Sequence, residues 1–310
     1  MKTLVLMAAG FWAMAGSARA TTYYVTISGL GGEPDYVQRF KMWADDIDTS
    51  LKKAGGDSNV TTLEAPTRDK IRARMAELAA QAKPSDAVVL MLIGHGTFDG
   101  TDYKFNIPGP DVTGADLAAM LDKIPATRQL VVNMTSSSGG SIPFLRRPGR
   151  VVITATKSGT EKNATIFARY WAEAMRDPAA DADKNESVSA LEAFLYAQRK
   201  TKDFFDAQKR LATEHAVVED TGKGEGDMPN PSTPDGEGRL AASFSLVRLG
   251  ANAAAANDPV KRPLLDRKEQ LEQQIDKLKF EKAALPTDEY KQRLTALLVE
   301  LAKVQEALDK

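Results

Sequence analysis

The chain has 310 residues, of which 43% are hydrophobic and 27% are charged, an ordinary balance for a soluble globular protein. Its 41 basic and 42 acidic residues give a net charge of −1, so no basic excess indicates nucleic-acid binding and no acidic bias indicates disorder. The sequence contains no cysteine, which excludes disulfide bonds, a lipid anchor attached to cysteine, and catalysis by a cysteine thiol. The length suits one large domain with a small appendage.

Residues 1–20 have the features of a signal peptide. Lys2 gives a short positive start, residues 4–16 form a compact apolar run, and Ala18-Arg19-Ala20 is a small-x-small cleavage site. A membrane anchor is the alternative, but the apolar run is shorter than the ~20 residues that a spanning helix needs. We therefore predict a secreted or periplasmic bacterial protein with no membrane span after cleavage.

Strand patterns then alternate with amphipathic helix patterns. We predict strands at 22–27, 59–63, 87–93 and 128–134, a brief extended piece at 103–107, and helices at 35–54, from Thr67 to about 82, and after Thr113. This alternation is typical of a mostly parallel sheet with helices on both faces.

The strands at 87–93 and 128–134 carry the candidate site. The first is an uninterrupted apolar run, typical of a strand buried on both faces, and it is followed at once by Gly94-His95-Gly96. The second ends in Thr135-Ser136-Ser137-Ser138-Gly139. Residues after such strands lie at the carboxyl edge of the sheet, where we expect the His95 imidazole and the Ser136 hydroxyl to meet as base and nucleophile. A histidine that merely ends a strand is the alternative interpretation.

The second half continues the pattern. We predict a strand from residue 150, helices at 163–175 and from 187 to about 217, and a last strand at 240–249. Residues 219–237 are rich in Gly, Pro and Asp, which favours a mobile flap above the site; too few oxygen ligands alternate there to predict a metal site. His215, alone beside this loop, is interpreted as structural or solvated rather than as a second base.

The C-terminal region has a composition of its own. An alanine-rich linker at 251–263 precedes two charged helices, at 264–284 and 288–309, which Pro286 separates. Their apolar residues recur at coiled-coil spacing and predict an antiparallel hairpin at 264–310. One interpretation is that the hairpin closes on itself; the other is that it forms a homodimer or binds a partner. Tight docking on the main domain, residues 21–250, is the least favoured arrangement.

These motifs resemble the legumain-like and caspase-like cysteine peptidases, in which one strand ends in Gly-His-Gly and another in Ala-Cys-x-Ser-Gly. Gly94-His95-Gly96 matches the first motif, and Ser136 stands at the position of the family's cysteine. The strand at 150–159 and the helix at 163–175 also resemble the legumain branch. Over about residues 21–250 the resemblance implies a caspase-like three-layer α/β sandwich with a mostly parallel central sheet. It also implies an oxyanion hole made by the backbone N–H groups of Gly96 and Ser136.

The change from thiol to hydroxyl bears on the activity. In legumain-like sites the histidine and cysteine lie rather far apart, which suits a thiolate but activates a serine hydroxyl poorly. The resemblance therefore implies a secreted pseudo-peptidase that binds or scaffolds a peptide or protein ligand through a degenerate site. The alternative is an active peptidase or hydrolase with a Ser136/His95 dyad. We predict no cofactor, no metal and no nucleic-acid partner.

Overall fold

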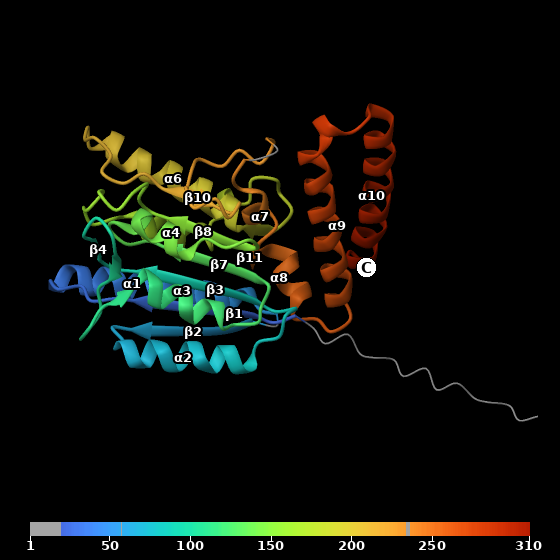
Figure 1. Cartoon of the computed structure of the whole chain (residues 1–310). Helices are drawn as coiled ribbons and strands as arrows, with labels where there is room; N and C mark the ends of the chain where they lie inside the picture. The colour runs from blue at the N-terminus through green and yellow to red at the C-terminus, as the bar shows by residue number, and fades with distance from the viewer. Residues whose placement is uncertain (1–19, 57, 234–235) are drawn as a thin grey trace, which may run out of the picture.

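The computed structural model describes residues 20–56, 58–233 and 236–310 (Figure 1). Apart from Ala20, the predicted signal peptide lies outside the described residues. Among the helices that are described, none combines the length and the apolar character needed to cross a membrane.

A six-stranded sheet forms the centre of the main domain. Its strand order is β10-β8-β7-β3-β1-β2. The strands are β1 (Thr22–Ser28), β2 (Ser58–Glu64), β3 (Ala87–Ile93), β7 (Arg128–Asn133), β8 (Arg150–Thr154) and β10 (Val217–Glu219). Every neighbouring pair is parallel except β10 with β8, which is antiparallel. The predicted mostly parallel sheet is confirmed.

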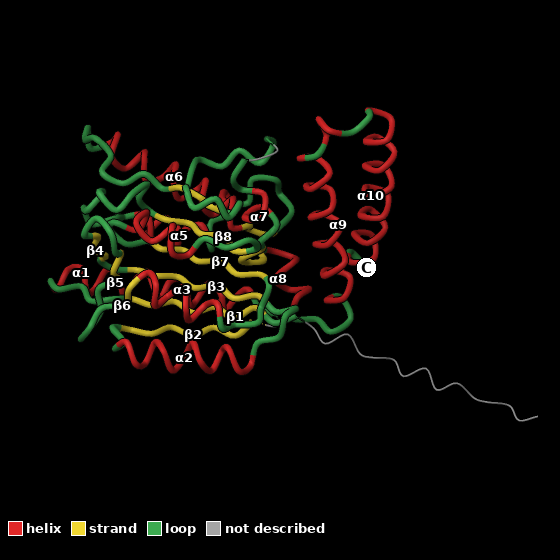
Figure 2. The backbone as a smooth tube through the Cα atoms, in the orientation of Figure 1, coloured by secondary structure: helices red, strands yellow, loops and turns green. Residues whose placement is uncertain are grey.

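Helices cover both faces of this sheet (Figures 1 and 2). One face carries α1 (Pro34–Ala54), α5 (Phe167–Ala174), α6 (Ala190–Ala207) and the short α7 (Arg239–Ala242), and the other carries α2 (Arg68–Gln81), α3 (Gly114–Asp122) and α4 (Ile142–Leu145). Successive side chains of β3 alternate between the two cores: Val89 and Met91 enter one, Val88 and Leu90 the other. A strand buried on both faces therefore needs an uninterrupted apolar run. The predicted three-layer sandwich is confirmed.

Several short elements escaped the sequence analysis. They are β4 (Gly96–Phe98), β6 (Val112–Thr113), β9 (Ser187–Ser189), and the 3-10 turns η1 (Ser138–Ser141) and η2 (Pro178–Ala180). The extended piece predicted at 103–107 is β5 (Tyr103–Phe105). The strand predicted at 240–249 is only β11 (Ser245–Arg248), because residues 239–242 form α7, and the end of the first predicted hairpin helix is the 3-10 turn η3 (Lys282–Ala284). The helix predicted from 187 to about 217 was wrong at both ends. Ser189 and Glu192 form a capping box that starts α6 at Ala190, and the helix ends at Ala207, before β10. The helix predicted at 163–175 begins only at Phe167, because Thr165 Oγ1 instead donates to the Met134 carbonyl at 2.6 Å.

The C-terminal helices pack on the main domain. Residues of the predicted linker form α8 (Gly250–Ala256), whose buried Asn252 donates from Nδ2 to the Asn185 carbonyl at 2.9 Å. α9 (Arg262–Phe280) and α10 (Thr287–Leu308) form the predicted hairpin (Figure 1). Arg248 donates to both carboxylate oxygens of Glu269 on α9, at 2.6 and 2.9 Å. Docking of the hairpin on the domain, which the linker composition disfavoured, is therefore what the structure shows.

Candidate functional site

The carboxyl ends of four parallel strands meet at one edge of the sheet. Ile93 of β3 lies opposite Ser28 of β1, and Asn133 of β7 lies opposite Thr154 of β8. Because Leu92 of β3 is the partner of Asn133, the loops after all four strands begin at nearly the same level. The histidine and serine loops therefore lie side by side at this edge.

The two loops touch through Gly96 and Ser136. The Gly96 N–H donates to Ser136 Oγ at 3.3 Å, and Ser136 is only 3% exposed. This approach depends on the missing side chain of Gly96, since a Cβ there would lie 2.5 Å from the Ser136 carbonyl oxygen and 2.7 Å from Thr135 Oγ1. The amide that we assigned to an oxyanion hole thus meets the serine hydroxyl itself.

The His95 ring packs against aromatic side chains. Its centroid lies 4.8 Å from that of Tyr36 and 5.1 Å from that of Phe40, both in edge-on geometry. Within the described part of the chain, no hydrogen bond joins the imidazole to Ser136. Burial lowers the pKa of His95 below its ordinary value, opposed by hydrogen bonding to the Gly31 backbone and by the charge of Glu33. Because this shift is downward from 6.5, the ring is neutral at pH 7, the form that can accept a proton.

Most other hydroxyls of the serine loop are structural. Thr135 Oγ1 bonds to the Tyr103 hydroxyl at 2.7 Å and donates to Asn133 Oδ1 at 2.8 Å. Ser138 Oγ bonds to Thr156 Oγ1 at 3.1 Å and accepts the Thr156 N–H at 3.0 Å. These groups are buried and mutually satisfied, so they hold the loop rather than offering a reactive group.

Ser137 is the strained residue of this loop. Its φ of 55° and ψ of 14° are left-handed, a region that residues other than glycine seldom adopt. Its N–H donates to the Glu161 carbonyl at 2.8 Å, and its buried Oγ has no hydrogen-bond partner among the described residues. Contacts with neighbouring segments, Glu161 in particular, must hold this conformation.

Glu161 ties the serine loop to His215. Its carboxylate accepts the backbone N–H groups of Lys157 at 2.9 Å and His215 at 3.1 Å, and it lies 2.5 Å from His215 Nδ1. The sequence analysis did not identify Glu161, which lies in the loop between β8 and α5 with no local pattern to mark it. The carboxylate orients the exposed His215 imidazole.

A cleft of about 580 Å³ opens beside the serine loop. Its apolar walls are Phe98, Ile142 and Phe144, and glycines of several loops supply backbone surface; residues 224–226 of the predicted flap form part of the lining. The Phe98 ring lies directly over Gly140 and Gly159, where added Cβ atoms would come within 2.7 and 2.2 Å of it. The lining also includes Lys157 and Glu225, so the cleft combines apolar walls, backbone groups and one charge of each sign, which suits an extended peptide.

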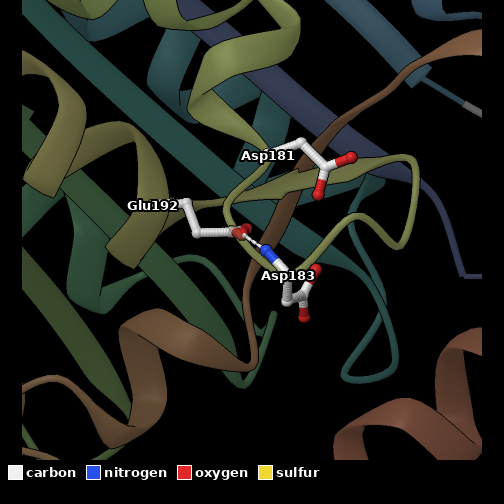
Figure 3. Close-up of side chains that lie close together, drawn as sticks. All are labelled: Asp181, Asp183 and Glu192. Atoms are coloured by element: carbon white, nitrogen blue, oxygen red, sulfur yellow. Dashed lines mark hydrogen bonds between the residues drawn. The ribbon is translucent and has the colours of Figure 1, made fainter.

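Three carboxylates away from this edge lie within 4.8 Å of one another: Asp181, Asp183 and Glu192 (Figure 3). Glu192 accepts the backbone N–H groups of Ala182 and Ser189, both at 2.9 Å, and Asp181 accepts two N–H groups of the same turn. Burial, reinforced by the neighbouring Glu192, raises the pKa of Asp183 to about 6. Because these oxygens already stabilise the turn and the start of α6, we assign no ion to the cluster.

This chain is similar to known proteins in its three-dimensional structure. No protein-family model matches the chain, and no curated protein matches it either. The chain is similar to the crystal structure of caspase-1 from Spodoptera frugiperda, with a TM-score of 0.48 and 12% identity over 64% of this chain and 86% of that one. It is also similar to the Drosophila initiator caspase Dronc, with a TM-score of 0.45 and 12% identity over 67% of this chain and 82% of that one. Because both TM-scores are below 0.5, no residue of this chain is given a role from these two structures.

Proposed function

We propose that this chain is a peptidase-like protein that binds an extended peptide at the carboxyl edge of its sheet without cleaving it. One observation carries the proposal: Ser136 Oγ meets the Gly96 N–H, whereas the His95 ring packs on Tyr36 and Phe40. A serine nucleophile needs a base within hydrogen-bond reach to take its proton. Ser136 lacks that base, so binding is favoured over turnover.

The proposal includes a finer assignment, a legumain-like peptidase homologue with Ser136 in place of the cysteine. The 3.3 Å contact between the Gly96 N–H and Ser136 Oγ supports it, because the motif implies a nucleophile next to this oxyanion donor. The predicted signal peptide would make the protein secreted or periplasmic in a bacterium. Its ligand would then be a peptide or protein outside the cytoplasm.

A working hydrolase is the second candidate function. The lowered pKa of His95 favours it, because a neutral imidazole at pH 7 is the form that acts as a general base. The two candidates differ in whether Ser136 can ever transfer its proton to His95.

Replacement of Ser136 by cysteine tests the proposed site. We expect the natural protein to show no turnover of peptides cleaved after Asn or Asp, and no labelling by a peptide chloromethyl ketone. The S136C variant should be labelled, because a thiol ionises far more readily than a hydroxyl and the Gly96 N–H stabilises the thiolate. Labelling, followed by mass spectrometry, should fall by roughly tenfold when His95→Ala is added, because a nearby imidazolium stabilises a thiolate by its charge even without a direct hydrogen bond.

Ser50→Cys, at a half-buried position of α1 outside the cleft, is the control for ordinary thiol reactivity. Equal labelling of the two cysteine variants would contradict a specific site at Ser136. An inert S136C protein with an unchanged circular dichroism spectrum would do the same. Turnover by the natural protein that disappears in both Ser136→Ala and His95→Ala would establish the hydrolase instead.

A further inference from the structure

Helix α10 carries more apolar surface than α9 covers. Every residue of α10 is described, and of these Leu308 alone is buried. Leu294, Leu297 and Leu301 stay half-buried, while Leu298 and Val299 are 47% and 50% exposed. At about 100° per residue, the apolar positions from 294 to 304 span roughly 220° of the helix circumference. An arc of this width is more than one neighbouring helix can bury.

The uncovered part of this arc faces away from the main domain. In Figure 1, α9 lies between the domain and α10. Leu308, at the end of α10, packs with Ala255, Ala256 and Leu265 of α8 and α9, which leaves the middle of the helix to α9 alone. We call Thr295, Leu298, Val299 and Ala302 the outer face of α10.

We propose that the outer face of α10 pairs with the outer face of a second copy of this chain, with the two helices antiparallel. The two hairpins then form a four-helix arrangement, in which each α10 has two helical neighbours. The inference is independent of the peptide-binding function proposed above.

The register of the pair follows from the position of the large apolar residues. A two-fold axis between Leu298 and Val299 brings Leu298 of one copy level with Val299 of the other, and Thr295 level with Ala302. Thr295 and Ala302 are small, so the helices can approach closely on either side of the central pair. The outer face is therefore complementary to itself in shape.

The charges beside the outer face are complementary in the same register. Lys291 comes level with Glu306 of the other copy, and the two-fold axis makes this contact twice. Lys291 is exposed and has no ion pair among the described residues, whereas Glu306 pairs only with the exposed Lys310. Asp288 comes level with Asp309, a like-charge contact that Lys310 beside Asp309 partly offsets. This arrangement favours a second copy over an unrelated partner as the occupant.

Light scattering and sedimentation equilibrium on the full chain test the proposal. We expect twice the monomer mass for the natural protein. Leu298→Glu and Val299→Glu should each give the monomer mass with an unchanged circular dichroism spectrum, because each places two carboxylates in the pair interface. Leu211→Glu is the matched control: Leu211 is 91% exposed on the main domain, and its replacement should leave the dimer intact.

A charge exchange tests the antiparallel register. Lys291→Glu alone and Glu306→Lys alone should each raise the dimer dissociation constant by roughly tenfold, since each creates two like-charge contacts. The double variant should restore the natural dissociation constant. A natural protein that is monomeric at the highest attainable concentration would overturn the proposal. So would a dimer that persists in Leu298→Glu and Val299→Glu, or a double variant no better than the single ones.

Discussion

Replacing Gly96 with alanine is expected to lower the free energy of unfolding by about 3 kcal/mol and to abolish binding at the peptide site. The added Cβ would lie 2.5 Å from the Ser136 carbonyl oxygen and 2.7 Å from Thr135 Oγ1. Neither atom can move freely, because the Tyr103 hydroxyl and Asn133 hold Thr135 in a buried network. The histidine and serine loops must therefore separate. Urea unfolding measures the loss of stability, and labelling of Gly96→Ala in the S136C background measures the loss of the site.

Thr97→Ala is the control for this prediction, since the exposed Thr97 follows Gly96 on the same short strand. Its effect on unfolding should stay within about 0.5 kcal/mol. If Gly96→Ala unfolds at the same urea concentration as Thr97→Ala and is labelled equally well in the S136C background, the close contact of the two loops does not position the site.

The second large effect concerns the buried carboxyl group of Glu214. It accepts the N–H groups of Ile166 at 2.9 Å and Phe167 at 3.2 Å, where α5 begins, and burial raises its pKa from 4.5 to about 7. Between these two values the folded protein keeps a proton that the unfolded chain releases. The contribution of Glu214 to the free energy of unfolding is therefore fully present below pH 4.5. It falls as the pH rises from 4.5 through about 7. At about 1.4 kcal/mol per pKa unit, the loss is on the order of 3 kcal/mol.

Glu214→Gln should flatten this dependence, because an amide still accepts the two N–H groups but does not ionise. The measurement is the free energy of unfolding between pH 4.5 and 8 for both proteins. Burial also raises the pKa of Glu237 and Glu272 to about 7, so part of the slope should remain in the variant. Glu225→Gln, which removes an exposed carboxylate, controls for the change in net charge. An unchanged slope in Glu214→Gln would mean that Glu214 does not hold its proton in the folded state.

The pattern of apolar residues was sufficient to predict the main architecture. The continuous run at 87–93 and the run at 128–134 predicted buried strands, which the structure shows to be neighbours, and periodicity placed α1, α2 and the helical hairpin. The same reasoning brought the His95 and Ser136 loops to one edge, because parallel strands share the direction of their carboxyl ends. Short elements such as β4 and β9 were missed, since three residues carry too little periodicity to be distinguished from a loop.

The sequence by itself determined the long strands and helices of the main architecture, because their apolar periodicity depends on residues close along the chain. With parallel strands, it also determined which loops reach the carboxyl edge. Only the tertiary structure decided where the side chains go. The His95 ring packs on Tyr36 and Phe40 of α1, and Glu161 bonds to His215, 54 residues away. Likewise, Asn252 of α8 donates to the Asn185 carbonyl, 67 residues away, which fixes where α8 lies on the domain. Such contacts depend on the packing of distant segments, and no local pattern specifies them.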